Sequence, residues 1–101
     1  MSWGQKLVTS YVKVRWDHEF MEEPVDIFSE LDDDRFEVRK VEVYRDGRLD
    51  WADSSRGTGT TFLGEVPFPD LEEINSQEEF HAEPITAAEF EAAWRRARSK
   101  R

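Results

Sequence analysis

Alternating hydrophobicity between residues 7 and 20 is the feature that most constrains the fold of this chain. One parity of the stretch carries apolar side chains, namely Val8, Val12, Val14, Trp16 and Phe20. The other parity is largely polar and consists of Tyr11, Lys13, Arg15 and Asp17. Successive side chains of a strand point to opposite faces, so this pattern predicts a half-buried β-strand.

A second, weaker alternation follows at Val25, Ile27 and Leu31. It comes directly after Pro24, which suits the start or the edge of a strand because proline has no N–H to donate. The run Asp32-Asp33-Asp34 then predicts a turn.

Residues 35–53 have the pattern of a β-hairpin, with Asp46-Gly47 as the turn signal. A two-residue loop would place apolar side chains opposite acidic ones. A three-residue loop with Gly47 in the left-handed region instead pairs Val43 with Leu49 and Val41 with Trp51, which gathers one apolar face. We therefore expect the three-residue loop with a G1 bulge.

The first arm of this hairpin must change faces. Phe36 and Val38 share one parity, whereas Val41 and Val43 share the other. A bulge or strong bend near Arg39-Lys40 would account for the change, and so would a strand covered on both sides.

The connection after the hairpin is poor in structural signals. The stretch 54–64 is rich in Gly, Ser and Thr and predicts a mobile loop. Residues 63–68 suit a short edge strand, and Asp70 suits the N-cap of a short helix over 71–75.

The strongest local signal is a C-terminal helix over residues 86–98. Thr86 and Glu89 form a capping box, and Ile85 with Phe90 forms a hydrophobic staple. Glu91 and Arg95 suit an i,i+4 ion pair. The expected apolar stripe consists of Ala87, Phe90, Trp94 and Ala97.

These elements predict an α+β fold, with a four-stranded, mostly antiparallel sheet and the C-terminal helix packed on one face. Residues 1–101 suit a single domain, with a flexible lead over 1–6 and a frayed basic tail over 99–101. Phe90 and Trp94 are expected to pack on the sheet against Val12, Val14, Trp16, Ile27, Val41 and Trp51.

Acidic residues are concentrated in blocks. The chain has 14 Lys and Arg against 23 Asp and Glu, a net charge of -9. Residues 17–34 hold no Lys or Arg, and their expected partner-binding acids are Asp17, Glu19, Glu22, Glu23, Asp32, Asp33 and Asp34. This charge argues against nucleic-acid binding and suits a basic protein partner. No apolar run is long enough for a membrane span, and no export signal is visible, so we expect a cytoplasmic protein.

No constellation typical of catalysis stands out, so no catalytic residue, cofactor or metal site is expected. His18 lies between Asp17 and Glu19, but neighbouring strand residues face opposite ways, so a histidine that caps the core is the favoured interpretation. Two histidines and no cysteine make a zinc site improbable. The Asp32-Asp33-Asp34 run lacks the glycine that a calcium-binding EF-hand loop needs.

Several segments resemble a family of small uncharacterised actinobacterial proteins, a domain of unknown function. The similarity spans about residues 11–94 and rests on Tyr11-Val-Lys-Val-Arg-Trp-Asp-His-Glu-Phe20, Glu23-Pro-Val25, Ser29-Glu-Leu-Asp32, Arg35-Phe-Glu-Val-Arg-Lys-Val-Glu-Val-Tyr-Arg-Asp-Gly47, Leu63-Gly-Glu65 and Leu71-Glu-Glu-Ile-Asn75. The resemblance implies one intracellular bacterial domain and brings no catalytic residues with it.

Three hypotheses of function follow. The first is a non-enzymatic, acidic protein-binding module of the immunity-protein or antitoxin type, which masks a basic partner surface. The alternative is a small ligand-binding domain or enzyme with a site near His18, Glu19 and Arg15. The third is a nucleic-acid mimic, which requires carboxylates spaced along a rod-like face. The sequence leaves the oligomeric state open.

Overall fold

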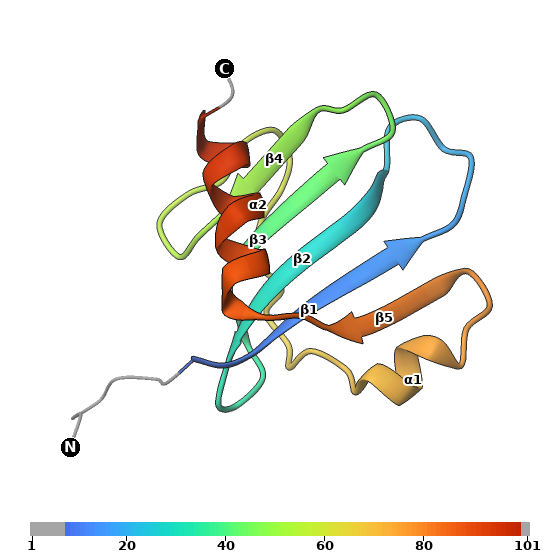
Figure 1. Ribbon diagram of the computed structural model, residues 1–101, viewed down its shortest axis with the longest axis vertical. Helices are drawn as coiled ribbons and strands as arrows, with labels where there is room; N and C mark the ends of the chain where they lie inside the picture. Colours follow the sequence, from blue (N-terminus) through green and yellow to red (C-terminus); the bar gives the residue numbers. More distant parts are fainter. Residues whose placement is uncertain (1–7, 100–101) are drawn as a thin grey trace.

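The computed structural model describes residues 8–99, which form an α+β fold (Figure 1). One sheet has the strand order β4-β3-β2-β1-β5, and every neighbouring pair is antiparallel. The elements in chain order are β1 (Val8–Trp16), β2 (Pro24–Asp32), β3 (Glu37–Tyr44), β4 (Leu49–Ala52), α1 (Leu71–Asn75), β5 (Phe80–Pro84) and α2 (Ala87–Ser99). The expected class and the C-terminal helix are confirmed, but the sheet has five strands rather than four.

The strand that the sequence pattern did not reveal is β5. It pairs with β1 at the edge of the sheet, with Trp16 opposite Phe80 and Val14 opposite Ala82. Within β5 only Phe80 and Ala82 are partly buried, and the other residues of the strand are His81, Glu83 and Pro84. A short edge strand of this kind has too few apolar positions to show a clear period of two.

The edge strand expected at residues 63–68 is wrong, since this stretch forms no strand. Pro67 and Pro69 lack the N–H groups that a ladder needs. Phe68 instead pairs with Arg35. The Phe68 N–H donates to the Arg35 carbonyl at 2.7 Å, and the Arg35 Nε donates to the Phe68 carbonyl at 3.0 Å.

The hairpin and the face change follow the expectations. Val43 lies opposite Leu49 and Val41 opposite Trp51, and Gly47 has a φ of 92°, as the three-residue loop requires. The β2–β3 register shifts between Glu30 and Leu31, whose partners are Arg39 and Glu37. This bulge turns the later part of β3 so that Val41 faces α2.

Both faces of the sheet are covered, and this corrects the expected packing of β1. The core beneath α2 consists of Val41, Leu49, Trp51, Phe90, Ala93, Trp94 and Ala97. Val12 and Val14 belong to the opposite face, where they pack with Leu31 and Ile74. From β1 it is Tyr11 that meets the helix, with its ring centroid 5.6 Å from that of Phe90. Alternation along a strand defines two faces but does not say which one the helix covers.

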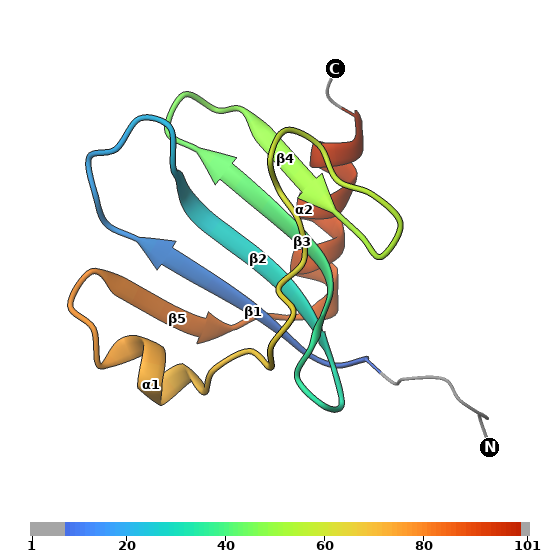
Figure 2. The ribbon, with the colours of Figure 1, turned by 180° about the vertical axis from the view of Figure 1, so that it is seen from behind.

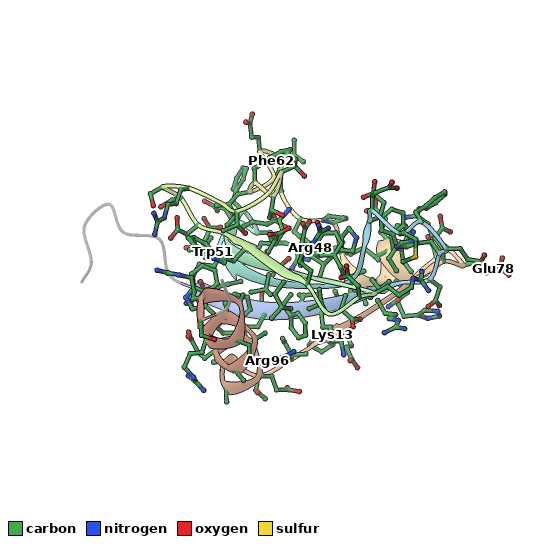
Figure 3. All side chains as sticks on the ribbon, turned by 90° about the horizontal axis from the view of Figure 1, so that it is seen from above. Lys13, Arg48, Trp51, Phe62, Glu78 and Arg96 are labelled. Atoms are coloured by element: carbon green, nitrogen blue, oxygen red, sulfur yellow. The ribbon has the colours of Figure 1, made fainter. Side chains whose placement is uncertain are left out.

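The second face is covered by the connection from β4 to β5, which includes α1. Figure 2 shows this connection crossing the sheet on the side away from α2. Figure 3 shows the sheet edge-on, with α2 on one side and Phe62 projecting on the other. The helix expected over 71–75 is confirmed as α1, but the side chain of its N-cap residue Asp70 makes no capping hydrogen bond.

The capping box of α2 is confirmed. The Glu89 N–H donates to the Thr86 hydroxyl at 3.1 Å, and the Thr86 N–H donates to the Glu89 carboxylate at 2.8 Å. In the apolar stripe Ala93 takes the place expected for Ala87, which is exposed. The expected lead over 1–6 and residues 100–101 of the expected tail lie outside the described residues, whereas Ser99 belongs to α2.

A charged group ties α2 to the sheet. The Arg39 guanidinium lies 4.9 Å from the ring centroids of both Phe90 and Trp94. It also pairs with the carboxylates of Glu30, which is only 4% exposed, and Glu91. Glu91 therefore pairs across the interface with Arg39, rather than forming the expected ion pair with Arg95. A buried carboxylate depends on such a partner, because water no longer solvates it.

Backbone groups along the outer edge of β5 are already occupied. The side-chain amide of Asn75 accepts from the Ala82 N–H at 2.6 Å and donates to the Ala82 carbonyl at 2.9 Å. The Phe80 N–H donates to the Gln77 carbonyl, and Pro84 has no N–H. This arrangement leaves the edge poorly suited to pairing with a strand of another chain.

We predict that Arg39→Ala lowers the free energy of unfolding by about 3 kcal/mol, because it leaves the Glu30 carboxylate buried without its cation. Arg98→Ala is the matched control, since Arg98 also lies over Trp94, at 5.5 Å, but is exposed. Arg98→Ala should lower the free energy of unfolding by only about 0.5–1 kcal/mol. Urea unfolding of the two variants measures the difference, and equal losses would contradict the assigned role of Arg39.

The stability of the fold should depend on the ionisation of Glu91. The hydrogen bond from Arg39 lowers the pKa of Glu91 below its ordinary value of 4.5. A carboxyl whose pKa is lowered in the folded state stabilises the fold above its ordinary pKa, and this stability is lost as the pH falls through the lowered value. Glu91→Gln should therefore be less stable than the wild type at neutral pH, and the gap should close below about pH 4. A stability difference between the two proteins that does not change with pH would contradict the pairing of Glu91 with Arg39.

Candidate functional site

The acidic residues expected to bind a partner separate into two groups. Asp17, Glu19, Glu22 and Glu23 lie on the loop between β1 and β2. Asp33 and Asp34 lie in the turn between β2 and β3, at the opposite end of the sheet (Figure 1). The 9 residues of β2 separate the two ends by about 30 Å. The acidic run is therefore continuous in sequence but divided in space.

Asp32 is built into the turn between β2 and β3. It is only 6% exposed, and its Oδ1 accepts hydrogen bonds from the N–H groups of Asp34 and Phe36, both at 2.9 Å. This side chain fixes the turn from inside, while Asp33 and Asp34 are exposed.

The loop over residues 17–23, here called the acidic loop, carries apolar side chains at its tip. Phe20 and Met21 are each 62% exposed. The four carboxylates of Asp17, Glu19, Glu22 and Glu23 flank them, and all four residues are exposed. Two large exposed apolar side chains on a loop with four exposed acidic residues make an amphipathic surface, and adjacent exposed apolar groups commonly mark interaction sites.

The His18 ring makes hydrogen bonds to backbone groups at the tip and at the end of the acidic loop. The Phe20 N–H donates to its Nδ1 at 2.9 Å, and its Nε2 lies 2.8 Å from the Pro24 carbonyl oxygen. The carbonyl can only accept, so Nε2 carries the proton and Nδ1 is the acceptor. The ring also packs on Trp16, with centroids 4.2 Å apart. Backbone groups therefore occupy both ring nitrogens, and neither is free for acid–base catalysis.

Further contacts anchor the start of the loop. The Arg45 guanidinium, from the β3–β4 turn, donates to the His18 carbonyl. The Asp17 N–H donates to the Glu79 carbonyl at 2.8 Å, and the Asp17 carboxylate lies 3.1 Å from Nε2 of His81. Beside these anchors is an open cavity of about 400 Å³, lined by Arg15, Trp16, Asp17, His18, Glu19, Val25 and Arg45. His81 is exposed and lies in β5.

A groove continues the acidic surface onto the second face of the sheet. Its volume is about 390 Å³, and it lies between the acidic loop and the β4–α1 connection. The lining residues are Glu22, Glu23, Pro24, Lys40, Glu42, Tyr44, Thr60, Thr61 and Phe62. Sequence reasoning missed Glu42, Tyr44 and Phe62, because they come from segments distant from the acidic run. The only sequence signal was a lone Phe in a Gly/Ser/Thr-rich stretch.

The connection that carries Phe62 is attached to the sheet. The Thr58 N–H donates to the Trp51 carbonyl at 2.8 Å, the Thr61 hydroxyl donates to Glu42, and the Gly64 N–H donates to Glu37 at 2.6 Å. These contacts place the 54–64 segment, expected to be a mobile loop, at defined points on β3 and β4.

The groove is lined by three ionisable side chains of β3, namely Lys40, Glu42 and Tyr44. Burial, followed by the nearby charge of Glu42, raises the pKa of Tyr44 from 10.0 to about 12. The Tyr44 hydroxyl also donates to the Glu42 carboxylate at 3.2 Å. The ammonium of Lys40 lies 3.7 Å from Glu37 and 4.0 Å from Glu42, so these carboxylates balance its charge.

We predict that Glu42→Gln lowers the pKa of Tyr44 toward its ordinary value, because the variant removes the negative charge beside the phenol. Ultraviolet absorbance of phenolate during an alkaline titration measures the change. Asp33→Asn, at the other end of the sheet, is the control and should leave the titration unchanged. An unaltered titration in Glu42→Gln would contradict the assigned geometry.

The described residues show neither a metal-binding cluster nor a membrane-spanning helix. Among residues 8–99, no group of three or more His, Asp or Glu side chains is arranged to hold a metal ion. Within the same part of the chain, neither helix has the length and apolar character needed to cross a bilayer.

Comparison with known proteins places the chain in a family without an assigned activity. No curated protein and no solved structure matches it. A family model described as a domain of unknown function, DUF6881, matches residues 10–99. The match covers most of the chain, including the acidic loop, the groove and α2. The chain belongs to the DUF6881 family, a domain of unknown function.

Proposed function

We propose that this protein is a non-enzymatic, cytoplasmic binding module of the immunity-protein or antitoxin type, and that the acidic loop docks onto a basic surface of a partner protein. The observation that carries the proposal is the exposure of Phe20 and Met21 at the tip of a loop that holds four exposed acidic residues. Apolar anchors supply contact area, and the surrounding charges select a basic partner and steer its approach.

The anchoring of the loop supports this role. Hydrogen bonds to His18 and from Arg45 fix its backbone before any partner arrives. A segment that is already ordered loses less conformational entropy on binding than a flexible one. The loop therefore has the properties of a preformed recognition element.

The groove extends the proposed surface. Phe62 is 69% exposed and forms one wall, while Glu22 and Glu23 belong to the opposite side. Lys40 is already paired with carboxylates of β3 and does not offset the charge of these two rim residues. An extended lysine or arginine side chain of a partner fits this chemistry, with its aliphatic part against Phe62 and its charge near the two carboxylates.

The alternatives have less support in the geometry. An enzyme site near His18 lacks a free ring nitrogen, because both nitrogens bond to the backbone. A nucleic-acid mimic needs a continuous row of carboxylates, whereas the expected acids divide between two ends of β2. Binding by strand addition at β5 meets an edge that Asn75 already occupies.

Selection from a random peptide display library tests the proposal. Two variants are compared with the wild type: Phe20→Ser/Met21→Ser, which removes the apolar tip, and Glu19→Gln/Glu22→Gln/Glu23→Gln, which removes three charges. We expect the enriched peptides to combine basic and apolar residues. We also expect affinity to fall at least tenfold in each variant and to weaken at high salt.

A matched control variant changes acids at the distant turn. Asp33→Asn/Asp34→Asn removes two exposed carboxylates and should leave peptide binding unchanged. The proposal fails if the enriched peptides are not basic, or if they bind the loop variants and the wild type equally well. Circular dichroism of each variant confirms that its fold is intact.

A further inference from the structure

We propose that His18 is a pH-sensitive latch on the acidic loop, so that protonation of its ring releases the tip and weakens partner binding. The consequence for binding rests on the proposed function. The latch itself is a property of the free protein and is tested without any partner.

The geometry of the ring gives the latch its two states. In the closed loop, Nδ1 accepts the Phe20 N–H and Nε2 donates to the Pro24 carbonyl. One imidazole thus bridges the tip of the loop and the first residue of β2. Only the neutral ring can do this, because a protonated imidazole carries hydrogen on both nitrogens and has no acceptor left.

Protonation places two donors against each other. The new N–H at Nδ1 would point at the Phe20 N–H, so the hydrogen bond is lost and the two groups must separate. Phe20 also packs on the His18 ring, with centroids 5.4 Å apart, so movement of one shifts the other. The apolar tip would then leave its fixed position.

The charged neighbours of His18 come from its own segment and from the β3–β4 turn. Arg15, Asp17 and Glu19 share the adjoining cavity with it, and the Arg45 guanidinium bonds to its carbonyl. β2 contributes only Val25 to the lining of that cavity, and this side chain is uncharged. The hydrogen bond from the Phe20 N–H to Nδ1 is therefore the contact that distinguishes the closed from the open state.

His81 is a second titratable group that needs to be separated from the latch. It lies 3.1 Å from the Asp17 carboxylate, and a positive charge on His81 would strengthen that pair. Protonation of His81 would therefore hold the start of the loop in place, which is opposite to the effect proposed for His18. His81→Gln removes this competing response and is the background for the test.

Nuclear magnetic resonance of the wild type and of His81→Gln, from about pH 8 to about pH 5, tests the latch, because imidazoles change charge in this range. We expect the neutral His18 ring to carry its proton on Nε2. The Phe20 amide signal should shift, and its protection from hydrogen exchange should fall, in step with the His18 ring. The Phe36 amide, held by Asp32 at the far turn, should not follow the same titration.

Two results would overturn the latch. One is a neutral His18 ring with its proton on Nδ1, and the other is a Phe20 amide that stays unchanged while His18 gains its charge. His18→Gln in the His81→Gln background adds an independent check. The glutamine side chain does not titrate, so the Phe20 amide signal should then be insensitive to pH. If that variant fails to fold, the wild-type titration still decides.

Binding of a selected peptide without histidine connects the latch to function. In His81→Gln we expect its affinity to fall on the order of fivefold on acidification, as for the loss of about one hydrogen bond. If the Phe20 amide follows the titration of His18 but no basic peptide is selected, the proposed function is refuted and the latch stands. A selected peptide whose affinity does not change with pH would refute the regulatory role and leave the proposed function standing.

Discussion

A sheet with apolar side chains on both faces has to be covered twice, and this requirement shapes the whole molecule. The longer helix, α2, covers one face, where Arg39 joins it to the buried carboxylate of Glu30. The other face is covered by α1 and by irregular chain, which Glu37 and Glu42 hold through bonds from Gly64 and Thr61. Because these partly buried carboxylates need hydrogen-bond partners, the bonds fix the path of the connection. They thereby place Phe62 beside the acidic loop.

Local chemistry made parts of the fold predictable. The Asp46-Gly47 turn set the register of the hairpin, and Thr86 with Glu89 marked the start of α2. The face of β1 that α2 covers was not predictable, because alternation is symmetric between the two faces. β5 was hidden for another reason, since an edge strand with two partly buried side chains has almost no hydrophobic period.

The candidate site was predictable in its charges but not in its shape. The sequence located the acids, yet the length of β2 separates Asp33 and Asp34 from the acidic loop. The bonds of His18 run to backbone groups, which no side-chain pattern reveals. Under the proposed function, the charges of the loop supply selectivity and its apolar side chains supply contact area. Under the proposed latch, the His18 imidazole ties the order of the loop to pH.

The account depends on Phe20 and Met21 being held in place before a partner binds. Backbone ¹⁵N relaxation of the free protein at about pH 8, where an imidazole is neutral, tests this most directly. The account predicts order parameters for these two amides of about 0.85, the value typical of a rigid backbone. Values below about 0.6 would show a flexible loop. They would contradict the preformed docking tip on which the proposed function and the latch both depend.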